Sequence, residues 1–240
     1  MTLRATSALA AAFLFLAPAS SLAGLTAYSQ NFESLVQSDP AALSNNGWLV
    51  YGNVFSPDHS VFYYGYGPFP APNNTGAFCG IDFLPGVPPQ GLQDMVVYSD
   101  YNNGDQANGN LIEANVFQQQ TIASGDVGST WTFQFDAKLG NLAGSSTALA
   151  FIKTLDPNSG YATTHFITAD MTTIPSTWGT FSLSIPIDPS LVGQILQFGF
   201  ANTTTHYQGS GVFYDDISFT HGSVVPTKPR TWGSLKSQYR

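Results

Sequence analysis

The 240-residue sequence is poor in the residues that most often carry catalysis, metal binding or covalent cross-links. Its one cysteine, Cys79, excludes an intrachain disulfide, and a small buried side chain is the role we expect for it. The only glutamates are Glu33 and Glu113. The histidines at 59, 165, 206 and 221 lack the spacing of a zinc site. No Gly-x-Ser-x-Gly elbow, His-Glu-x-x-His helix or glycine-rich phosphate loop is present.

Basic residues are equally scarce in the body of the chain. Between residues 24 and 221, Lys138 and Lys153 stand against all fifteen acidic residues, which gives that segment a net charge of −13. Such a surface repels phosphate backbones and anionic membranes, so we expect no nucleic-acid partner. The same charge argues against an acidic polysaccharide such as a uronate chain, and it suits neutral ligands or divalent cations.

Residues 1–23 have the pattern of a secretory signal peptide. Arg4 precedes an apolar run from Ala8 to Leu16, and small residues precede a cleavage point near Ala23. The run is well short of the roughly 20 residues that span a membrane, so we expect no membrane span in the mature chain. We therefore expect a secreted protein that is extracellular, periplasmic or held at the cell surface. Residues 24–221 have the length of one domain, and residues 222–240 are expected to form a flexible basic tail that contains prolines.

Short alternating runs separated by turn residues predict an all-β fold, a two-sheet β-sandwich of jelly-roll type. In the segment 131–139, Trp131, Phe133 and Phe135 fall on one face while Gln134 and Asp136 fall on the other. The expected strands cover 25–34, 47–55, 94–100, 111–122, 129–140, 147–155, 160–169, 178–187, 195–205 and 211–220. The stretches 56–76 and 84–93 hold many of the prolines, and we expect them to be long loops.

Several landmarks occur in a characteristic order: NFES (31–34), GW (47–48), WTFQFDAKLG (131–140), STWGTFSLSIPI (176–187) and FYDDISF (213–219). In this order the chain resembles the galactose-binding-like jelly-roll domain of extracellular carbohydrate-binding modules, the kind associated with xylanases and glucanases. The stretch 56–93 departs from that pattern because it is longer and more aromatic than the usual connection. The resemblance implies a sandwich whose first and last strands lie together, and a sugar as the ligand.

The resemblance also implies a structural calcium ion, Ca2+, shared by the first and last strands. Carried over to this chain, it indicates Glu33, Asp215 and Asp216 as metal ligands, and calcium prefers such carboxylate oxygens. Strand alternation places Asp215 on the inward face with Phe213 and Ile217, and it places Asp216 at the rim. The alternative is a buried aspartate that is satisfied by backbone N–H groups without a metal.

Loop aromatics are the expected ligand-binding groups. Sugar rings stack on aromatic side chains, and polar side chains then bind the hydroxyl groups. The segment 59–70 is rich in tyrosine between glycines and prolines, and two further segments, 99–110 and 203–211, carry polar and aromatic residues. The candidates are Tyr63, Tyr64, Tyr66 and Tyr207 for stacking, with Asn102 and Gln208 as polar partners. A self-packed loop and a turn-rich hairpin are the structural alternatives for these segments.

The favoured function is therefore a secreted, non-catalytic protein that binds a neutral polysaccharide or oligosaccharide. One alternative is an adhesion or assembly protein whose C-terminal tail docks to a surface or matrix partner. A second is a small glycan-active hydrolase or lyase, for which Glu113 and Asp136 on neighbouring strands are a conceivable carboxylate pair.

Overall fold

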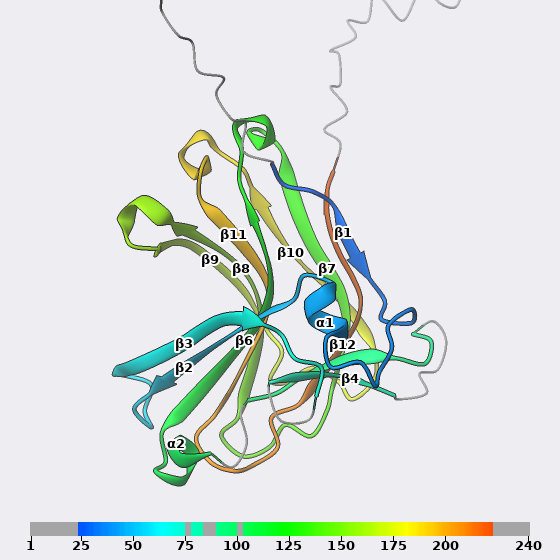
Figure 1. Cartoon of the computed structure of the whole chain (residues 1–240), viewed down its shortest axis with the longest axis vertical. Helices are drawn as coiled ribbons and strands as arrows, with labels where there is room; N and C mark the ends of the chain where they lie inside the picture. The colour runs from blue at the N-terminus through cyan, green and yellow to red at the C-terminus, as the bar shows by residue number, and fades with distance from the viewer. Residues whose placement is uncertain (1–23, 75–77, 84–89, 100–102, 223–240) are drawn as a thin grey trace, which may run out of the picture.

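The computed structural model describes residues 24–74, 78–83, 90–99 and 103–222, which form two antiparallel sheets packed face to face (Figure 1). The predicted all-β two-sheet sandwich is confirmed. The predicted signal peptide, residues 223–240 of the predicted tail, and Asn102 lie outside the described residues. No helix in the described part of the chain is long and apolar enough to cross a membrane.

The first sheet, called sheet A, holds the beginning and the end of the domain. Its strand order is β10-β7-β12-β5-β4, and β1 also pairs with β12. The bounds are β1 Tyr28–Gln30, β4 Cys79–Asp82, β5 Asp94–Val97, β7 Thr130–Leu139, β10 Gly179–Pro186 and β12 Val212–His221. Both β1 and β5 pair with the same strand, β1 with residues 217–219 and β5 with residues 212–214. The first and last strands thus lie side by side, as the family resemblance implied.

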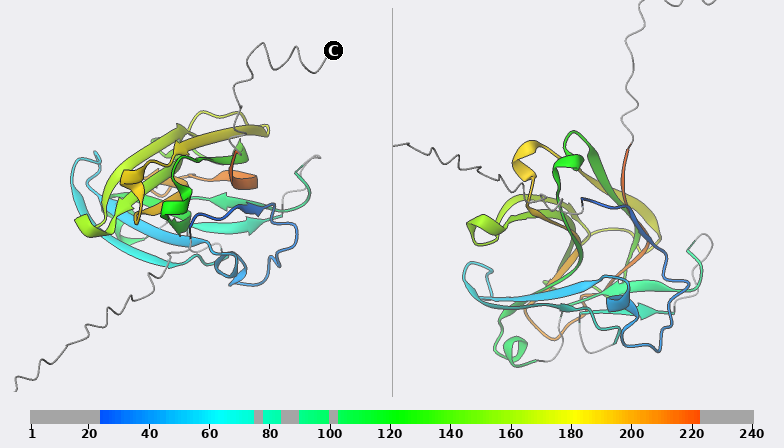
Figure 2. Two further views of the ribbon diagram at one scale, coloured as in Figure 1. Left: turned by 90° about the horizontal axis from the view of Figure 1, so that it is seen from above. Right: turned by 45° about the horizontal axis from the view of Figure 1, so that its top comes forward.

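The second sheet, sheet B, has the strand order β3-β2-β6-β11-β8-β9. Its strands are β2 Leu49–Phe55, β3 Phe62–Pro70, β6 Leu111–Thr121, β8 Thr147–Asp156, β9 Ala162–Asp170 and β11 Ile195–Thr204. Short helices α1 Ala42–Asn45 and α2 Gly104–Ala107 lie in the connections, with 3-10 turns η1 Ser124–Asp126, η2 Pro157–Ser159 and η3 Pro189–Leu191. Sheet B curves strongly, so its two edge hairpins, β2–β3 and β8–β9, stand apart (Figure 2).

The core between the sheets is built from aromatic rings. Phe198 of β11 stacks on Phe219 of β12 with ring centroids 4.2 Å apart, and Phe200 stacks on Tyr214 of β12 at 3.5 Å. Phe133 of β7 contacts both phenylalanines of β11, at 5.2 and 5.4 Å. All five side chains are fully buried. Stacked and tilted aromatic pairs add attraction beyond the area they bury, so β11, β7 and β12 hold the two sheets together.

The prediction of a loop over residues 56–76 was wrong, because residues 62–70 form strand β3. The misleading signals were its glycines and prolines. Gly65 lies where a Cβ would come within 2.4 Å of the Tyr51 hydroxyl, so this position of the strand needs glycine. Pro68 and Pro70 are tolerated because β3 is the edge strand of sheet B and one side of its backbone has no partner strand.

The prediction that Phe213 and Asp215 face the core was also wrong. The pairing of β12 with β7 shifts by one residue between Asp215 and Ser218, which marks a β-bulge, and Asp216 there has a φ of 45°. Tyr214, Ile217 and Phe219 consequently face the core, while Phe213 and Asp215 lie on the outer face of sheet A. Asp215 is nevertheless 1% exposed and Asp216 is exposed, as expected.

Phe200→Ala tests the aromatic core. Because the ring is fully buried and stacked across the sheet interface, its removal should lower the free energy of unfolding by about 3–5 kcal/mol. The measurement is denaturant unfolding followed by tryptophan fluorescence. Val192→Ala, at a residue 40% exposed, is the control and should change the free energy by less than about 0.5 kcal/mol. Equal effects of the two substitutions would contradict this account of the core.

Candidate functional site

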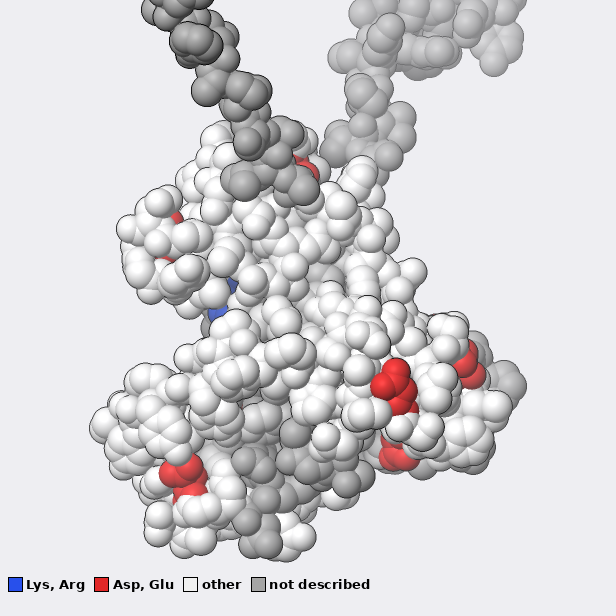
Figure 3. Space-filling view, in the orientation of Figure 1, with Lys and Arg blue, Asp and Glu red and all other residues white. Residues whose placement is uncertain are grey.

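A groove runs across the outer face of sheet B, on the side away from the core. It has a volume of about 860 Å3 and takes lining residues from all six strands of the sheet. The lining residues are Tyr51, Asn53, Phe62, Pro68, Phe117, Gln119, Lys153, Leu155, Tyr161, Thr163, Ile195 and Gln197. Figure 3 shows the surface hollowed between the β2–β3 and β8–β9 hairpins, with basic side-chain atoms inside.

Two adjacent cross-strand rows form the floor of the groove. Phe117 of β6 and Phe151 of β8 flank Gly199 of β11, and this row is apolar. The next row consists of Gln119, Gln197 and Lys153, in which the Gln197 Nε2 donates to Gln119 Oε1 at 2.8 Å. Phe117 is only 1% exposed and Phe151 is fully buried, so the apolar row supports the floor from below, and the amide row supplies polar groups that can bind the hydroxyl groups of a ligand.

Gly199 makes the apolar row possible. A Cβ at this position would lie 2.2 Å from the Val116 carbonyl oxygen and 2.9 Å from the Cβ of Phe117. The missing side chain leaves room for Phe117, which belongs with Phe151 and Ala201 to a small apolar cluster separate from the main core. The sequence held one signal for this site, since β6 and β8 carry apolar side chains on both faces.

Exposed aromatic residues stand at opposite walls of the groove. Phe62 of β3 is 55% exposed, and Tyr161, in the turn between β8 and β9, is 60% exposed. The Tyr161 backbone has a φ of 61°, which is unfavourable for a residue with a Cβ and is found most often where function or packing requires it. Tyr51 of β2 is partly buried beside the floor. The groove is therefore bordered by rings on both sides.

The groove face also carries one acidic side chain, Glu113, which is held by two amides. Its Oε1 accepts hydrogen bonds from Asn53 Nδ2 at 2.8 Å and from Asn115 Nδ2 at 2.9 Å. Asp136, the conceivable catalytic partner of Glu113, lies in β7 of sheet A, so the expected placement on neighbouring strands was wrong. The alternation of apolar and polar residues along a strand predicts the face on which each side chain lies, but it does not predict which sheet the strand joins.

The sequence-predicted ligand residues lie elsewhere. Tyr66 stacks on Phe78 with centroids 6.1 Å apart and packs against the core, and the Tyr64 hydroxyl donates to the Asp105 carboxylate at 2.5 Å. Tyr63 is 50% exposed on β3 beside the lining residue Phe62. Tyr207 and Gln208 lie in the β11–β12 connection, where Gln208 Nε2 donates to the Ser145 hydroxyl. The structure does not bring these five residues together in the groove.

Two of the predicted metal ligands, Asp215 and Asp216, lie on β12 of sheet A, where Asp215 belongs to a row of aspartates across the outer face of that sheet. Asp82 pairs with Asp94, and Asp215 pairs with Asp136. The β5–β12 register, extended by one residue, sets Asp94 opposite Asp215. Glu33 lies nearby and fixes a loop, because its Oε1 accepts from the backbone N–H groups of Leu92 and Gln93.

Two of these carboxylates are buried and incompletely paired. Asp94 is 2% exposed and its Oδ1 has no hydrogen-bond partner, and Oδ2 of Asp215 is likewise unpartnered. Burial, with a smaller contribution from the neighbouring negative charges, raises the pKa of Asp215 to about 8. Burial likewise raises the pKa of Asp94 to about 7, although the Lys138 ammonium opposes that rise. By contrast, the Asp136 carboxylate accepts from Gln90 and Thr180.

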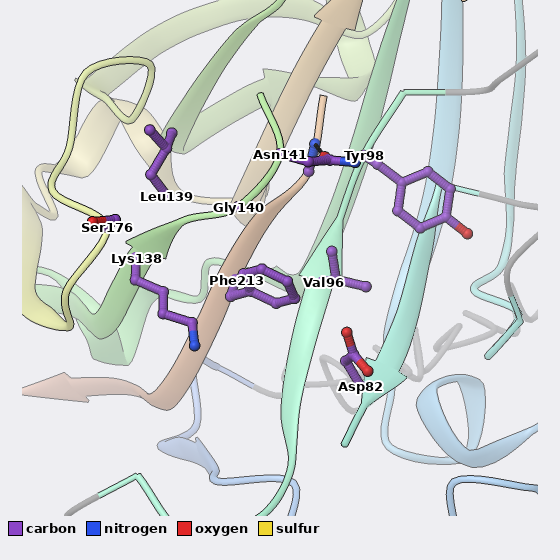
Figure 4. A pocket seen from close by; sticks show the side chains of 10 residues that line it. Asp82, Val96, Tyr98, Lys138, Leu139, Gly140, Asn141, Ser176 and Phe213 are labelled. Atoms are coloured by element: carbon purple, nitrogen blue, oxygen red, sulfur yellow. Dashed lines mark hydrogen bonds between the residues drawn. The ribbon is translucent and has the colours of Figure 1, made fainter. Parts of the chain in front are cut away.

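A second hollow, of about 550 Å3, adjoins this row on sheet A (Figure 4). Phe213 and Lys138 lie side by side in it, and the Lys138 Nζ sits 4.8 Å from the Trp178 ring centroid and 5.1 Å from that of Phe213. The lysine thus occupies the ring faces on which a ligand would stack. The groove on sheet B is the larger of the two and is bordered by the exposed rings of Phe62 and Tyr161, so it is the better candidate for ligand binding.

The aspartate row makes stability depend on pH. The carboxyl groups of Asp94 and Asp215 titrate near pH 4 in the unfolded chain and higher in the folded one, so the folded state binds more protons between pH 4 and 8. The free energy of unfolding should consequently fall as pH rises through this range. We expect a lower melting temperature at pH 8 than at pH 5 in a buffer with chelator, and a flatter profile for Asp215→Asn. An unchanged profile in that variant would contradict the assignment.

Comparison with known proteins gives matches to solved structures only, since no protein-family model and no curated protein matches the chain. A Stig cyclase from Fischerella sp. TAU matches with a TM-score of 0.48 and 15% identity, over 82% of this chain and 98% of that one. The CBM22-1 xylan-binding domain from Paenibacillus barcinonensis matches with a TM-score of 0.42 and 10% identity, over 85% and 97%.

A third match is the enzymatically active domain of bacteriophage CBA120 tailspike protein 4, with a TM-score of 0.46 and 13% identity. It covers 79% of this chain, which spans about a fifth (21%) of the tailspike chain. The matched structures thus include a carbohydrate-binding module of the kind that the sequence resembles, together with enzymes. Structural similarity at these TM-scores and identities does not indicate which of their functions this chain has.

Proposed function

We propose that this protein is an exported, non-catalytic carbohydrate-binding protein that takes a neutral glycan backbone into the groove of sheet B, with a structural calcium ion on sheet A. The observation that carries the binding proposal is the composition of the groove. The exposed rings of Phe62 and Tyr161 stand at opposite edges of the groove, and amide side chains, including Gln119 and Gln197, line it between them. Pyranose rings offer C–H faces for the first and hydroxyl groups for the second.

The composition of the groove supports binding without catalysis. None of its twelve lining residues is an aspartate or glutamate, whereas a glycosidase usually needs two carboxylates about 5–10 Å apart. Glu113 lies on the same face, but two amide donors already bind one of its oxygens and its expected partner is in the other sheet. The net charge of −13 that two lysines and fifteen acids give to residues 24–221 supports a backbone without its own charge.

The aspartate row fits calcium in its donor chemistry. Its buried, unpartnered oxygens on Asp94 and Asp215 are hard ligands of the kind that calcium prefers, and a cation beside them would stabilise the charged forms. Within the described residues, no group of three or more His, Cys, Asp or Glu side chains is placed so that it could hold a metal ion. We therefore propose Asp215 as the central ligand, with one of Glu33, Asp94 or Asp216 as a second carboxylate and with backbone carbonyls or water completing the shell.

A glycan array followed by titration calorimetry tests the binding function. The purified protein should bind at least one neutral polysaccharide, and Tyr51→Ala or Tyr161→Ala should lower the affinity about tenfold or more, because each removes a ring at the groove. Tyr207→Ala, at a residue 71% exposed and away from the groove lining, is the matched control and should leave the affinity unchanged. Absence of binding to every neutral glycan would contradict the proposal. Loss of binding only in Tyr207→Ala would place the binding site in the β11–β12 connection and not in the groove.

Calcium removal tests the ion. Chelation should lower the melting temperature by several degrees, since a ligand that binds only the folded state stabilises it. Asp215→Ala should abolish this sensitivity, while Asp170→Ala, on the exposed edge strand of sheet B, should retain it. Differential scanning calorimetry in chelator and in millimolar calcium makes the measurement. Superimposable curves for the unmodified protein would rule out the ion.

A further inference from the structure

The groove contains a single charged lining residue, Lys153. The other eleven lining residues are apolar, aromatic, hydroxyl or amide side chains. Lys153 stands on β8 at the end of the amide row of the floor, directly opposite Gln197 of the neighbouring strand. A single cation in the lining of a binding groove strongly constrains the charge of the ligand that the groove accepts.

The ammonium of Lys153 has no anionic partner within the described residues. Among those residues it makes no ion pair or hydrogen bond. Its Nζ makes a cation–π contact with the Phe151 ring, whose centroid lies 5.0 Å away. Burial lowers the pKa of this lysine, and the charge of Glu113 opposes that shift. Glu113 itself accepts its hydrogen bonds from Asn53 and Asn115, so its carboxylate is engaged by amides and not by the lysine.

Attraction to an aromatic ring compensates only part of what a partly buried ammonium loses when it leaves water. A carboxylate compensates far better, because a charge-assisted hydrogen bond is roughly twice as strong as a neutral one. An oxygen-bearing anion placed beside Lys153 would thus give the ammonium a partner, with the sugar ring held in the groove that Phe62 and Tyr161 border.

We infer that the groove selects a glycan whose neutral backbone carries an isolated carboxylate substituent, such as a uronic acid side residue, and that Lys153 is the residue that recognises it. This inference rests on the proposed glycan-binding function and specifies its ligand. It concerns one substituent and not a polyanion. With two lysines against fifteen acids in residues 24–221, the domain repels a chain that bears a charge on every sugar, while a single carboxylate meets the one cation of the groove.

The experiment uses two oligosaccharides built on whichever neutral backbone the glycan array selects. One carries a single uronic acid side residue, and the other carries the same residue with its carboxyl group reduced to the primary alcohol. In titration calorimetry with the purified protein, the acidic form should bind about tenfold or more tightly, because only it forms the charge-assisted bond. Raising the salt concentration should narrow the difference.

Variants test whether Lys153 causes the preference for the acidic oligosaccharide. Lys153→Met keeps the length of the side chain and should bind the two oligosaccharides with equal affinity. Lys153→Arg should keep the preference, which guards against a merely structural effect of the first variant. Lys138→Met, which removes the other lysine of the body on the opposite sheet, should also keep it.

The outcomes separate the two proposals. Equal binding of both oligosaccharides by the unmodified protein would overturn the carboxylate inference and leave glycan binding intact. A preference that persists in Lys153→Met, or an equal loss of both affinities in that variant, would show that the lysine serves another role and would also overturn it. Failure of every neutral glycan in the array would overturn the proposed function, and this inference with it.

Discussion

The stacking of β11 against β12 is the interaction on which the rest of this structure depends. Phe198 and Phe200 of β11 lie against Phe219 and Tyr214 of β12, and these contacts bridge the two sheets. Strand β11 presents Gln197 on its other face, where this side chain lies in the floor of the groove between Gln119 and Lys153. Side chains alternate along a strand, so the packing that stabilises the sandwich also fixes the position of the candidate site. A rigid strand is a better support for a binding site than a loop, because the core determines its side-chain directions.

The two outer faces of the sandwich differ in electrostatic character. Sheet A collects a row of aspartates, of which Asp94 and Asp215 are buried with unpartnered oxygens. The outer face of sheet B carries Lys153 in the groove lining and Glu113, which is held by Asn53 and Asn115, on the same face. This separation assigns different roles to the two faces. The acidic face is suited to a cation that stabilises the joined first and last strands, and the opposite face is suited to an uncharged or sparsely charged ligand.

Much of the fold was predictable because alternation is a local property of the chain. Each of the ten predicted segments contains a strand, and the closeness of the first and last strands was implied by the family resemblance. Strand β3 was missed because glycines and prolines usually mark loops, yet here an edge position and the Tyr51 hydroxyl make them suitable for a strand. The bulge at Asp216 was missed because one extra residue reverses the alternation, and only pairing with β7 reveals that residue.

The sequence by itself determined the all-β class, the acidic surface and the residue types available for chemistry. These depend on composition and on neighbours along the chain. The tertiary structure decided which residues meet. Phe117, Lys153 and Gln197 come from three separate strands and form one floor only because β6, β11 and β8 pair in register. The tyrosines of residues 63–66 looked like a site because they are clustered in sequence, whereas a groove is made by curvature of a sheet. Curvature and strand order arise from long-range packing, which no local pattern encodes.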